Sequence, residues 1–185
     1  MTYNIIYYET LGSTNDEAKK LAADGRPEGT VVISGAQTSG RGRLGKSWSS
    51  PASRGLYMSV VLRPQAPDVM KITVMAAVAV SRALDADIKW PNDIFINGKK
   101  VCGILCEAVC RQNGEIDAVI IGVGINTWDE NFSIPDDLKD IAGTVQNTLS
   151  NTELANEIAL EIIDAVTRGA EYFLPEYESR LIKPT

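Results

Sequence analysis

The strongest constraint on the fold is a pair of Asn-Gly dipeptides that separate runs of apolar and β-branched residues. Asn97-Gly98 follows the short runs IKW and IFI, and Asn113-Gly114 lies between KVCGILCEAVC and AVIIGVGIN. Asn and Gly adopt the positive φ angles that tight hairpin turns require. The sequence therefore predicts successive antiparallel strands over residues 87 to 126.

The rest of the chain predicts three further strands and three helices. Strands are expected at Asn4 to Glu9, Thr30 to Ala36 and Gly55 to Arg63. Helices are expected from the capping side chains of Ser13, Thr14 and Asn15 up to Gly25, from the cap Asp68 to about Leu84, and from Thr152 to Tyr172. An irregular acidic connection is expected from Asp129 to Thr144. Together these elements predict an α+β fold with a mixed, mainly antiparallel sheet backed by helices on one face.

Composition narrows the function. A length of 185 residues predicts one domain, and 44% hydrophobic with 23% charged residues is typical of a globular protein. The net charge of −6 disfavours a protein that binds the nucleic-acid backbone nonspecifically. Because the chain contains no histidine, catalytic triads and imidazole bases are excluded. Catalysis would have to use Lys, Arg, Asp or Glu.

Targeting signals and cysteines indicate the compartment. The N-terminal residues MTYNIIYYE show neither a basic leader nor a long apolar core, and no run is long enough for a membrane span, so we expect a cytoplasmic protein. Cys102, Cys106 and Cys110 are spaced four apart in an expected strand. We favour reduced core thiols over a zinc site, because apolar residues surround them and histidine is absent.

The segment from Gly40 to Ser47 reads GRGRLGKS and matches both the dinucleotide-binding and the P-loop patterns. A P-loop requires a helix that begins at its Lys-Ser pair, whereas WSSP follows here. We therefore interpret residues Thr38 to Arg54 as a long loop. Its cations Arg41, Arg43 and Lys46 suit an anionic ligand, and a solvated basic loop is the alternative. We expect this loop to be open without ligand and to become ordered over a bound adenylate.

Five segments in order resemble the catalytic domain of biotin protein ligases, the biotin–acetyl-CoA-carboxylase ligases. They are Ser13-Thr14-Asn15, the loop from Gln37 to Trp48, Gly55 to Ser59, the stretch KWPND that continues to KVCGILCE at residues 89 to 107, and Gly122-Val123-Gly124-Ile125-Asn126. The resemblance extends from Tyr8 to about Leu181. It implies the fold shared with class II aminoacyl-tRNA synthetases.

The resemblance also implies a two-step reaction. The biotin carboxylate attacks the α-phosphorus of MgATP to give biotinyl-5'-AMP, and a lysine of a biotin carboxyl carrier protein then accepts the biotinyl group. ATP and Mg²⁺ take part in the reaction, biotin is the substrate, and no tightly bound metal is expected. Neither step needs a protein nucleophile, which agrees with the absence of histidine.

Residue roles follow from that chemistry. The ureido ring needs short hydroxyl and amide side chains, and the bicycle and tail need an apolar slot. Expected biotin contacts are Ser13, Thr14, Asn15, Gln37, Gly40, Arg41, Gly42, Arg43, Trp48, Lys100, Gly103, Leu105, Gly122 and Gly124. Without the resemblance, Ser13 to Asn15 would be only a helix cap.

Lys100 is the main candidate for catalysis, as a cation beside the biotin carboxylate and the α-phosphate. Arg41 and Arg43 are expected to close over the same atoms. Asp93 is a candidate either for Mg²⁺ or for orienting Lys100. Expected nucleotide contacts are Arg43, Lys46, Lys89, Asn92 and Asn126. The alternative for Lys89, Lys99 and Lys100 is an ordinary charged hairpin tip.

The chain also departs from the resemblance. Residues 1 to 185 are expected to form the catalytic domain without an N-terminal helix-turn-helix, and hence without DNA binding. A C-terminal SH3-like domain is expected to be absent or truncated, which predicts biotin binding with weak ATP binding. A homodimer is possible on this reading. The alternatives are a lipoate ligase or transferase on the same fold and a non-catalytic biotin- or adenylate-binding fragment.

Overall fold

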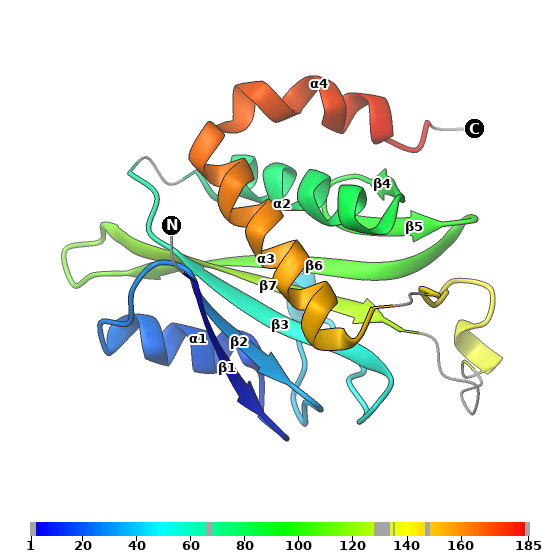
Figure 1. The fold of residues 1–185 in the computed structure, drawn as a ribbon, viewed down its shortest axis with the longest axis horizontal. Coiled ribbons are helices and arrows are strands. Elements are labelled where there is room, and N and C mark those ends of the chain that lie inside the picture. Colours follow the sequence, from blue (N-terminus) through cyan, green and yellow to red (C-terminus); the bar gives the residue numbers. More distant parts are fainter. Residues whose placement is uncertain (1–2, 66–67, 128–133, 135, 147–148, 184–185) are drawn as a thin grey trace.

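Seven strands form one mixed sheet in the computed structural model (Figure 1), which describes residues 3–65, 68–127, 134, 136–146 and 149–183. The strands are β1 (Asn4–Tyr8), β2 (Thr30–Ser34), β3 (Gly55–Leu62), β4 (Asp87–Lys89), β5 (Asp93–Ile96), β6 (Lys99–Cys110) and β7 (Ile116–Asn126), in the sheet order β1-β2-β3-β7-β6-β5-β4. Only β1 and β2 are parallel neighbours among these strands. The predicted α+β class and mainly antiparallel sheet are confirmed.

Both Asn-Gly hairpins form where the sequence predicts them. Asn97 and Gly98 have φ angles of 52° and 75° and join β5 to β6 as a two-residue turn. Gly114 has a φ of 85° in the turn between β6 and β7, where the Arg111 amide donates to the Glu115 carbonyl at 2.8 Å. The local turn chemistry therefore sets the antiparallel half of the sheet.

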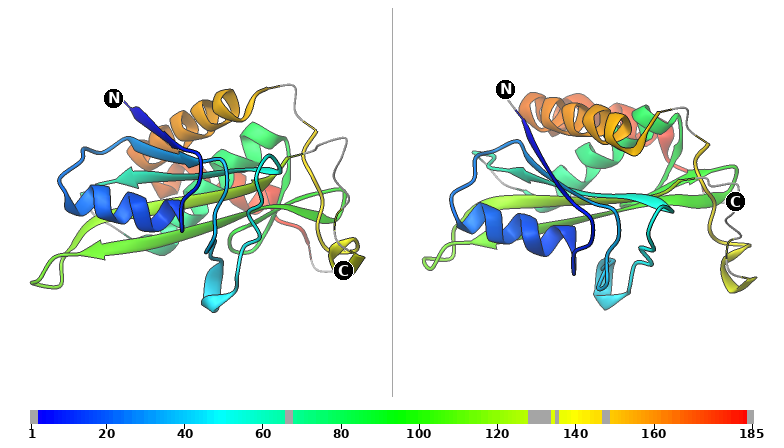
Figure 2. Two further views of the ribbon diagram at one scale, coloured as in Figure 1. Left: turned by 90° about the horizontal axis from the view of Figure 1, so that it is seen from below. Right: turned by 60° about the horizontal axis from the view of Figure 1, so that its bottom comes forward.

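Helices cover both faces of the sheet, so the prediction of helices on one face is wrong. The helices α2 (Val69–Leu84), α3 (Asn151–Arg168) and α4 (Ala170–Arg180) share one face, and α1 (Thr14–Ala23) packs on the other (Figure 2). The reason is alternation along the strands. In β7, Val119 and Ile121 face the larger core, whereas Ala118 and Ile120 pack with α1. We call these two sides the core face and the site face.

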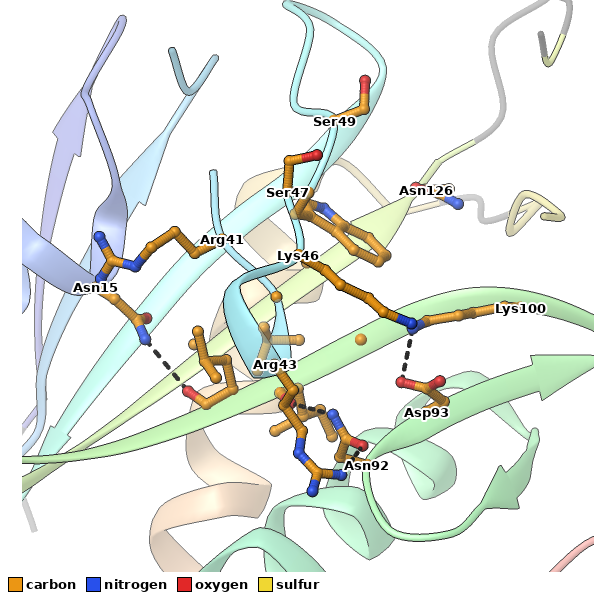
Figure 3. A pocket seen from close by; sticks show the side chains of 18 of the residues that line it. Asn15, Arg41, Arg43, Lys46, Ser47, Ser49, Asn92, Asp93, Lys100 and Asn126 are labelled. Atoms are coloured by element: carbon orange, nitrogen blue, oxygen red, sulfur yellow. Dashed lines mark hydrogen bonds and ion pairs between the residues drawn. The ribbon is translucent and has the colours of Figure 1, made fainter. Parts of the chain in front are cut away.

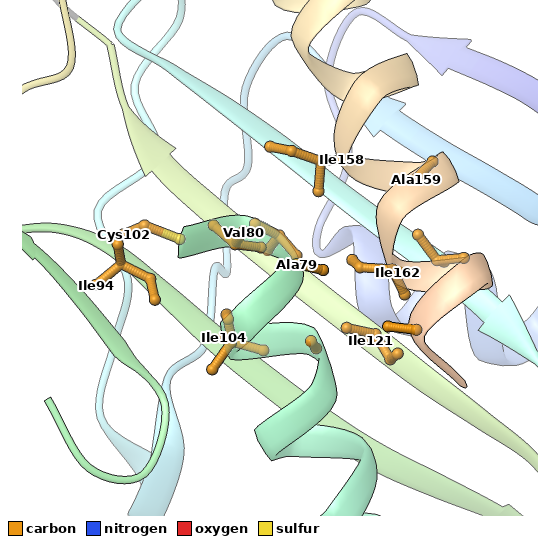
Figure 4. Close-up of a cluster of buried hydrophobic side chains, with 14 of the residues drawn as sticks. Ala79, Val80, Ile94, Cys102, Ile104, Ile121, Ile158, Ala159 and Ile162 are labelled. Carbon is orange, nitrogen blue, oxygen red and sulfur yellow. The ribbon is translucent and has the colours of Figure 1, made fainter. Parts of the chain in front are cut away.

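The main hydrophobic core lies between the core face and α2, α3 and α4. Ile104 and Ile121 of the sheet pack with Val80 of α2 and with Ile158 and Ile162 of α3, and all are at most 1% exposed (Figure 4). The side chains are β-branched or small, which suits close packing of helices on a sheet. This face is filled mainly with apolar side chains.

Two helix boundaries differ from the prediction. Ser13 occupies the N-cap position of α1, but its side chain makes no capping hydrogen bond. Gln37, distant in sequence, accepts from the Thr14 amide at 2.8 Å instead. The expected helix from Thr152 to Tyr172 is two helices, which meet at Gly169 with a φ of 90°. Asp68 caps α2 as predicted, through the amides of residues 70 and 71.

The cysteines all lie on β6 as free thiols, and only part of the core prediction is confirmed. Cys102 is buried, and Cys106 packs partly buried against the same core. Cys110 is exposed at the end of the strand, where Ala108 on the same face is already exposed. Burial raises the pKa of Cys106 to about 12.

The two connections beside the site are irregular, as expected. The loop of residues 38–54 contains only a short 3₁₀ turn, Arg43–Gly45, and no helix begins at Lys46. The predicted acidic connection falls partly outside the described residues, and its described part includes the 3₁₀ turn Asp136–Leu138. Within the described part of the chain, no helix is long and apolar enough to cross a bilayer.

Candidate active site

A cavity of about 710 Å³ opens on the site face at the N-terminal end of α1. On β7, the residues of this face decrease in size from Ile120 under α1 to Gly122 and Gly124 in the cavity. Gly103 and Leu105 of β6 pair with these two glycines and complete the floor. The 38–54 loop forms the opposite wall, on the same side of the sheet as α1 (Figures 2 and 3). The cavity therefore exists because α1 covers only part of the site face.

Buried hydroxyl and amide side chains line the end of the cavity nearest α1. Ser59 is fully buried, and its hydroxyl lies 2.8 Å from the Thr14 hydroxyl and 2.6 Å from the Asn15 carbonyl oxygen. A Cβ added at Gly122 would lie 2.2 Å from that same Asn15 oxygen, so only glycine leaves room for this amide. Ser13 is 5% exposed and lines the cavity without a capping bond, which leaves its hydroxyl for a ligand.

Gln37 joins this polar cluster to the base of the loop. Its side-chain oxygen accepts from the Thr14 amide and hydroxyl, and its nitrogen donates to the Ser50 hydroxyl at 2.8 Å. The Trp48 amide donates to the Gly40 carbonyl at 2.9 Å, which closes the base of the loop. A Cβ at Gly40 would lie 2.5 Å from the Trp48 carbonyl oxygen, so the two strands of the loop meet backbone to backbone. These contacts of Gln37 and Gly40 thus hold the two ends of the loop close together.

Trp48 lies flat on the glycine floor. Added Cβ atoms at Gly124 and Gly103 would lie 2.5 Å and 3.0 Å from its indole ring. The Lys100 ammonium nitrogen lies 5.4 Å from the ring centroid on the cavity side, within the range of a cation–π contact. The indole Nε1 is buried and has no hydrogen-bond partner in the structure. Gly103 and Gly124, which are expected to contact biotin, give room to the Trp48 ring in this structure, and Trp48 covers them.

Lys100 reaches the site face because β6 contains a β-bulge. Residues 101 and 102 are both buried in the core opposite Ile94, and Lys100 pairs with Phe95. This extra residue inverts the alternation, so Lys100 and Gly103 lie on the same face. The backbone of Lys100 is further fixed by hydrogen bonds to Ile141 and Gly143, each at 2.8 Å.

The side chain of Lys100 is paired with Asp93. Its nitrogen lies 2.7 Å from an Asp93 oxygen, and both side chains are slightly more than a quarter exposed. The close-up in Figure 3 shows Lys46 extending from the loop toward this pair. A cation held by a carboxylate and joined by a second lysine makes this end of the cavity suited to anionic groups.

The two loop arginines have different partners. Arg43 donates to the Asn92 side-chain oxygen at 2.9 Å, and the Asn92 nitrogen donates to the Ile104 carbonyl at 2.7 Å. Arg41 instead donates to the carboxylates of Asp16 and Glu107, near α1. The structure therefore does not bring both guanidinium groups together with Lys100, contrary to the expectation that they close over the same atoms.

Most of the predicted site residues line this one cavity. Those that do are Ser13, Thr14, Asn15, Gln37, Arg41, Gly42, Arg43, Lys46, Trp48, Asn92, Asp93, Lys100, Gly103, Leu105, Gly122, Gly124 and Asn126. Gly40 and Lys89 are outside the lining: Gly40 lies in the loop base, and the Lys89 nitrogen lies 5.2 Å from the centroid of the Phe95 ring. The described residues contain no group of three Cys, Asp or Glu side chains that could hold a metal ion.

Sequence reasoning assigned no role to several residues that organise the site. Ser59, Asp16 and Glu107 bind the side chains that line the cavity. The available signal was a charged Glu107 and a hydroxyl at Ser59 inside apolar strands, where polar side chains need partners. Trp90, which is 67% exposed, also lines the cavity.

The sequence profile of the biotin/lipoate A/B protein ligase family matches residues 7–126, which include the whole glycine floor and the loop. The chain belongs to this family. The matched range ends at Asn126, the last residue of β7, and the third and fourth helices lie beyond it.

Named relatives and solved structures agree with this assignment. The bifunctional ligase/repressor BirA of Bacillus subtilis is 44% identical over 150 residues, covering 77% of this chain and 46% of the relative. The biotin–[acetyl-CoA-carboxylase] ligase of Paracoccus denitrificans is 40% identical over 124 residues, covering 62% of this chain and 50% of the relative. The chain thus spans about half the length of these curated relatives.

The structure of a biotin protein ligase from Aquifex aeolicus in complex with biotin and ATP superposes with a TM-score of 0.81 at 29% identity. The superposition covers 97% of this chain and 78% of that one. The fold is therefore that of the biotin protein ligases, as the sequence predicts.

Proposed function

We propose that this chain activates biotin with ATP as biotinyl-5'-AMP and transfers the biotinyl group to a lysine of a biotin carboxyl carrier protein of acetyl-CoA carboxylase. The first step forms a bond from a carboxylate oxygen of biotin to the α-phosphorus and releases pyrophosphate. In the second step the lysine amine attacks the activated carbonyl and AMP leaves. The names and bound ligands of the relatives support this assignment.

The observation that carries the proposal is a difference between the two ends of the cavity: one end presents neutral polar groups and the other presents a cation. Neutral hydroxyl and amide groups lie at the Asn15 end, and the Lys100 ammonium lies above Gly103 at the other. Gly103 and Leu105, which contacts Asn15, are two residues apart on β6, or about 7 Å along the strand. A ligand with a neutral polar ring, an apolar body and a terminal carboxylate matches this arrangement.

Lys100 supports the first step by its charge. Placed between the carboxylate and the α-phosphate, its ammonium offsets the repulsion of two anions and the negative charge that develops on phosphorus. The Asp93 carboxylate, 2.7 Å away, orients that ammonium. Lys46 and Arg43 supply further positive charge from the loop. Because Asp93 holds the Lys100 ammonium before the substrate arrives, this cation needs little reorganisation during the reaction.

Nucleotide contacts are assigned to Asn92, Asn126, Arg43 and Lys46, which line the cavity near Lys100. Asp93 offers a carboxylate that fits a Mg²⁺ ion carried in with ATP, since Mg²⁺ is often held by one or two carboxylates together with substrate phosphates. The ion would neutralise phosphate charge. The role of the chain here is to hold the Asp93 carboxylate at the Lys100 end of the cavity.

A lipoate ligase is the second candidate, because the matched family includes both activities. The polar cluster at the Asn15 end favours biotin. A ureido group pairs with hydroxyl and amide side chains such as those of Ser13 and Thr14, whereas a dithiolane ring would leave them without partners.

The cellular setting follows from charge and cysteine chemistry. Three free thiols on β6 suit the reducing cytoplasm. A net charge of −6 disfavours DNA binding by this chain itself. The homodimer remains a prediction.

Incubation with α-³²P-ATP and either biotin or lipoate, followed by thin-layer separation, tests the proposal. We expect labelled biotinyl-AMP with biotin and no comparable adenylate with lipoate. Transfer of labelled biotin to a purified carrier domain tests the second step. A preference for lipoate would favour the second candidate, and the absence of both adenylates would contradict ligase activity.

A further inference from the structure

Arg41 is paired with acidic side chains and is not directed at the Lys100 end of the cavity. It donates to both oxygens of Asp16, with Nη2 at 2.7 Å from Oδ1, and also to Glu107 at 3.3 Å. The hydrogen bonds from Arg41 hold the pKa of Asp16 below its ordinary value, and this pairing raises the pKa of Arg41. The positive charge of Arg41 is therefore already matched inside the protein.

Glu107 connects this pair to the polar cluster. It accepts from the Asn15 amide at 2.7 Å and from Lys19 at 2.6 Å. Burial raises the pKa of Glu107, but the hydrogen bonds and charges of Lys19, Asn15 and Arg41 outweigh burial and leave the pKa below its ordinary value. Glu107 thus stays ionised and ties the loop to the first turns of α1.

The two loop arginines, on either side of Gly42, have partners on opposite sides of the cavity. Arg41 reaches Asp16 of α1, and Arg43 reaches Asn92 beside β5. Figure 3 shows Arg41 near Asn15 and Arg43 near Asn92. The loop is therefore braced across the cavity between two fixed elements.

We propose that Asp16 and Glu107 are positioning residues that anchor the 38–54 loop through Arg41. In this assignment, which rests on the proposed function, Arg41 sets the placement of the loop over biotin and does not contact the phosphate. The cations left for the reacting groups are Lys100, Lys46 and Arg43. Neutralising Asp16 would then loosen the loop and weaken biotin binding while leaving the adenylation step largely intact.

The test compares Asp16→Asn with Glu17→Gln, its neighbour on α1. Glu17 accepts from the Tyr8 hydroxyl at 2.9 Å and lies 4.0 Å from the Lys20 nitrogen, so its partners are in β1 and α1 and it controls for the loss of one helix carboxylate. For Asp16→Asn we expect KM for biotin to rise about 3- to 5-fold, the scale of a partly exposed ion pair, with kcat within about 2-fold. Asp16→Glu should restore most of the affinity.

Two further measurements separate anchoring from direct catalysis. Arg41→Gln should raise the KM for biotin at least as much as Asp16→Asn, because it removes the contacts to both Asp16 and Glu107. The double variant should be no worse than Arg41→Gln, because Asp16 acts only through Arg41. A loss of kcat of about 100-fold in Arg41→Gln alone would instead indicate contact with the reacting phosphate and overturn the proposal.

Trypsin cleavage after Arg43 and Lys46 reports loop placement without any activity. Asp16→Asn should be cleaved several-fold faster there than Glu17→Gln, and equal rates would overturn the anchor. Because this readout needs no adenylate, it tests the anchor even if the parent chain forms no biotinyl-AMP, a result that would contradict only the proposed function.

Discussion

The two faces of the sheet use the same strands for opposite purposes. On the core face, branched side chains such as Ile104 and Ile121 are buried against helices and leave no space. On the site face, the intervening residues include Gly103, Gly122 and Gly124, which give room to Trp48 and Asn15. One alternating sequence pattern thus encodes both stability and a binding site, so substitutions at adjacent positions of a strand should have separable effects.

The largest effect on stability is expected for Ile104→Ala on the core face. The side chain is 1% exposed, and truncation of a buried Ile costs about 2–5 kcal/mol through lost burial and a cavity. Chemical denaturation should show this loss. Leu105→Ala, its neighbour on the site face, should cost markedly less stability and weaken biotin binding more. Equal losses of stability would show that the two faces do not have separate roles.

Lys100→Ala should have the largest effect on chemistry. Removing a preorganised cation from the site should lower the rate of biotinyl-AMP formation about 10²–10³-fold, whereas loss of its partly exposed pair with Asp93 should cost at most about 1 kcal/mol of stability. Lys100→Arg should recover part of the rate, because a planar fork replaces a compact ammonium.

Lys99→Ala is the matched control for Lys100, since the Lys99 ammonium donates to the Lys139 carbonyl at 2.7 Å and neither residue lines the cavity. It should keep close to the parent rate. A Lys100→Ala protein with parent melting temperature and parent rate would show that the central site assignment is wrong.

Gly124→Ala should produce a smaller, mixed effect. The new Cβ would lie 2.5 Å from the Trp48 Nε1 atom, so the indole must move off the floor. Overpacking of this kind costs about 1–3 kcal/mol. We expect a lower melting temperature together with weaker biotin binding in calorimetry. A change in stability with unaltered biotin affinity would mean that the position of Trp48 does not affect the site.

Ser13→Ala should have the smallest effect on stability. Ser13 makes no capping bond, so its loss should cost less than about 0.5 kcal/mol, whereas Ser150→Ala, which removes a complete capping box on α3, should cost about 0.5–2 kcal/mol. Biotin affinity should nevertheless fall about 5-fold in Ser13→Ala, from the loss of one hydrogen bond. If Ser13→Ala destabilises the fold as much as Ser150→Ala, the hydroxyl serves the helix and not a ligand.

Features set by local chemistry could be predicted from the sequence. The Asn97-Gly98 turn, the Asp68 cap and the absence of a helix at Lys46 depend on neighbouring residues alone, and all are found in the structure. The grouping of most candidate residues around one cavity was also predicted, because the motifs resemble a family with a known order of segments.

Features set by long-range packing could not be predicted. The placement of α1 on the site face depends on which side of the sheet α2 and α3 already cover. Strict alternation from Gly103 would point Lys99, not Lys100, into the cavity, and only the bulge at residues 101 and 102 reverses this. The Gln37 side chain accepts from the Thr14 amide across 23 residues of sequence, and no local signal marks such a contact.

A crystal structure of the chain with bound biotin would show which face of the sheet carries the ligand. We expect the ureido ring against Ser13, Thr14 and Asn15 and the carboxylate beside Lys100, with the core face unchanged. Biotin bound outside this cavity, or with its carboxylate at the Asn15 end, would contradict the assignment of the site face as the binding site.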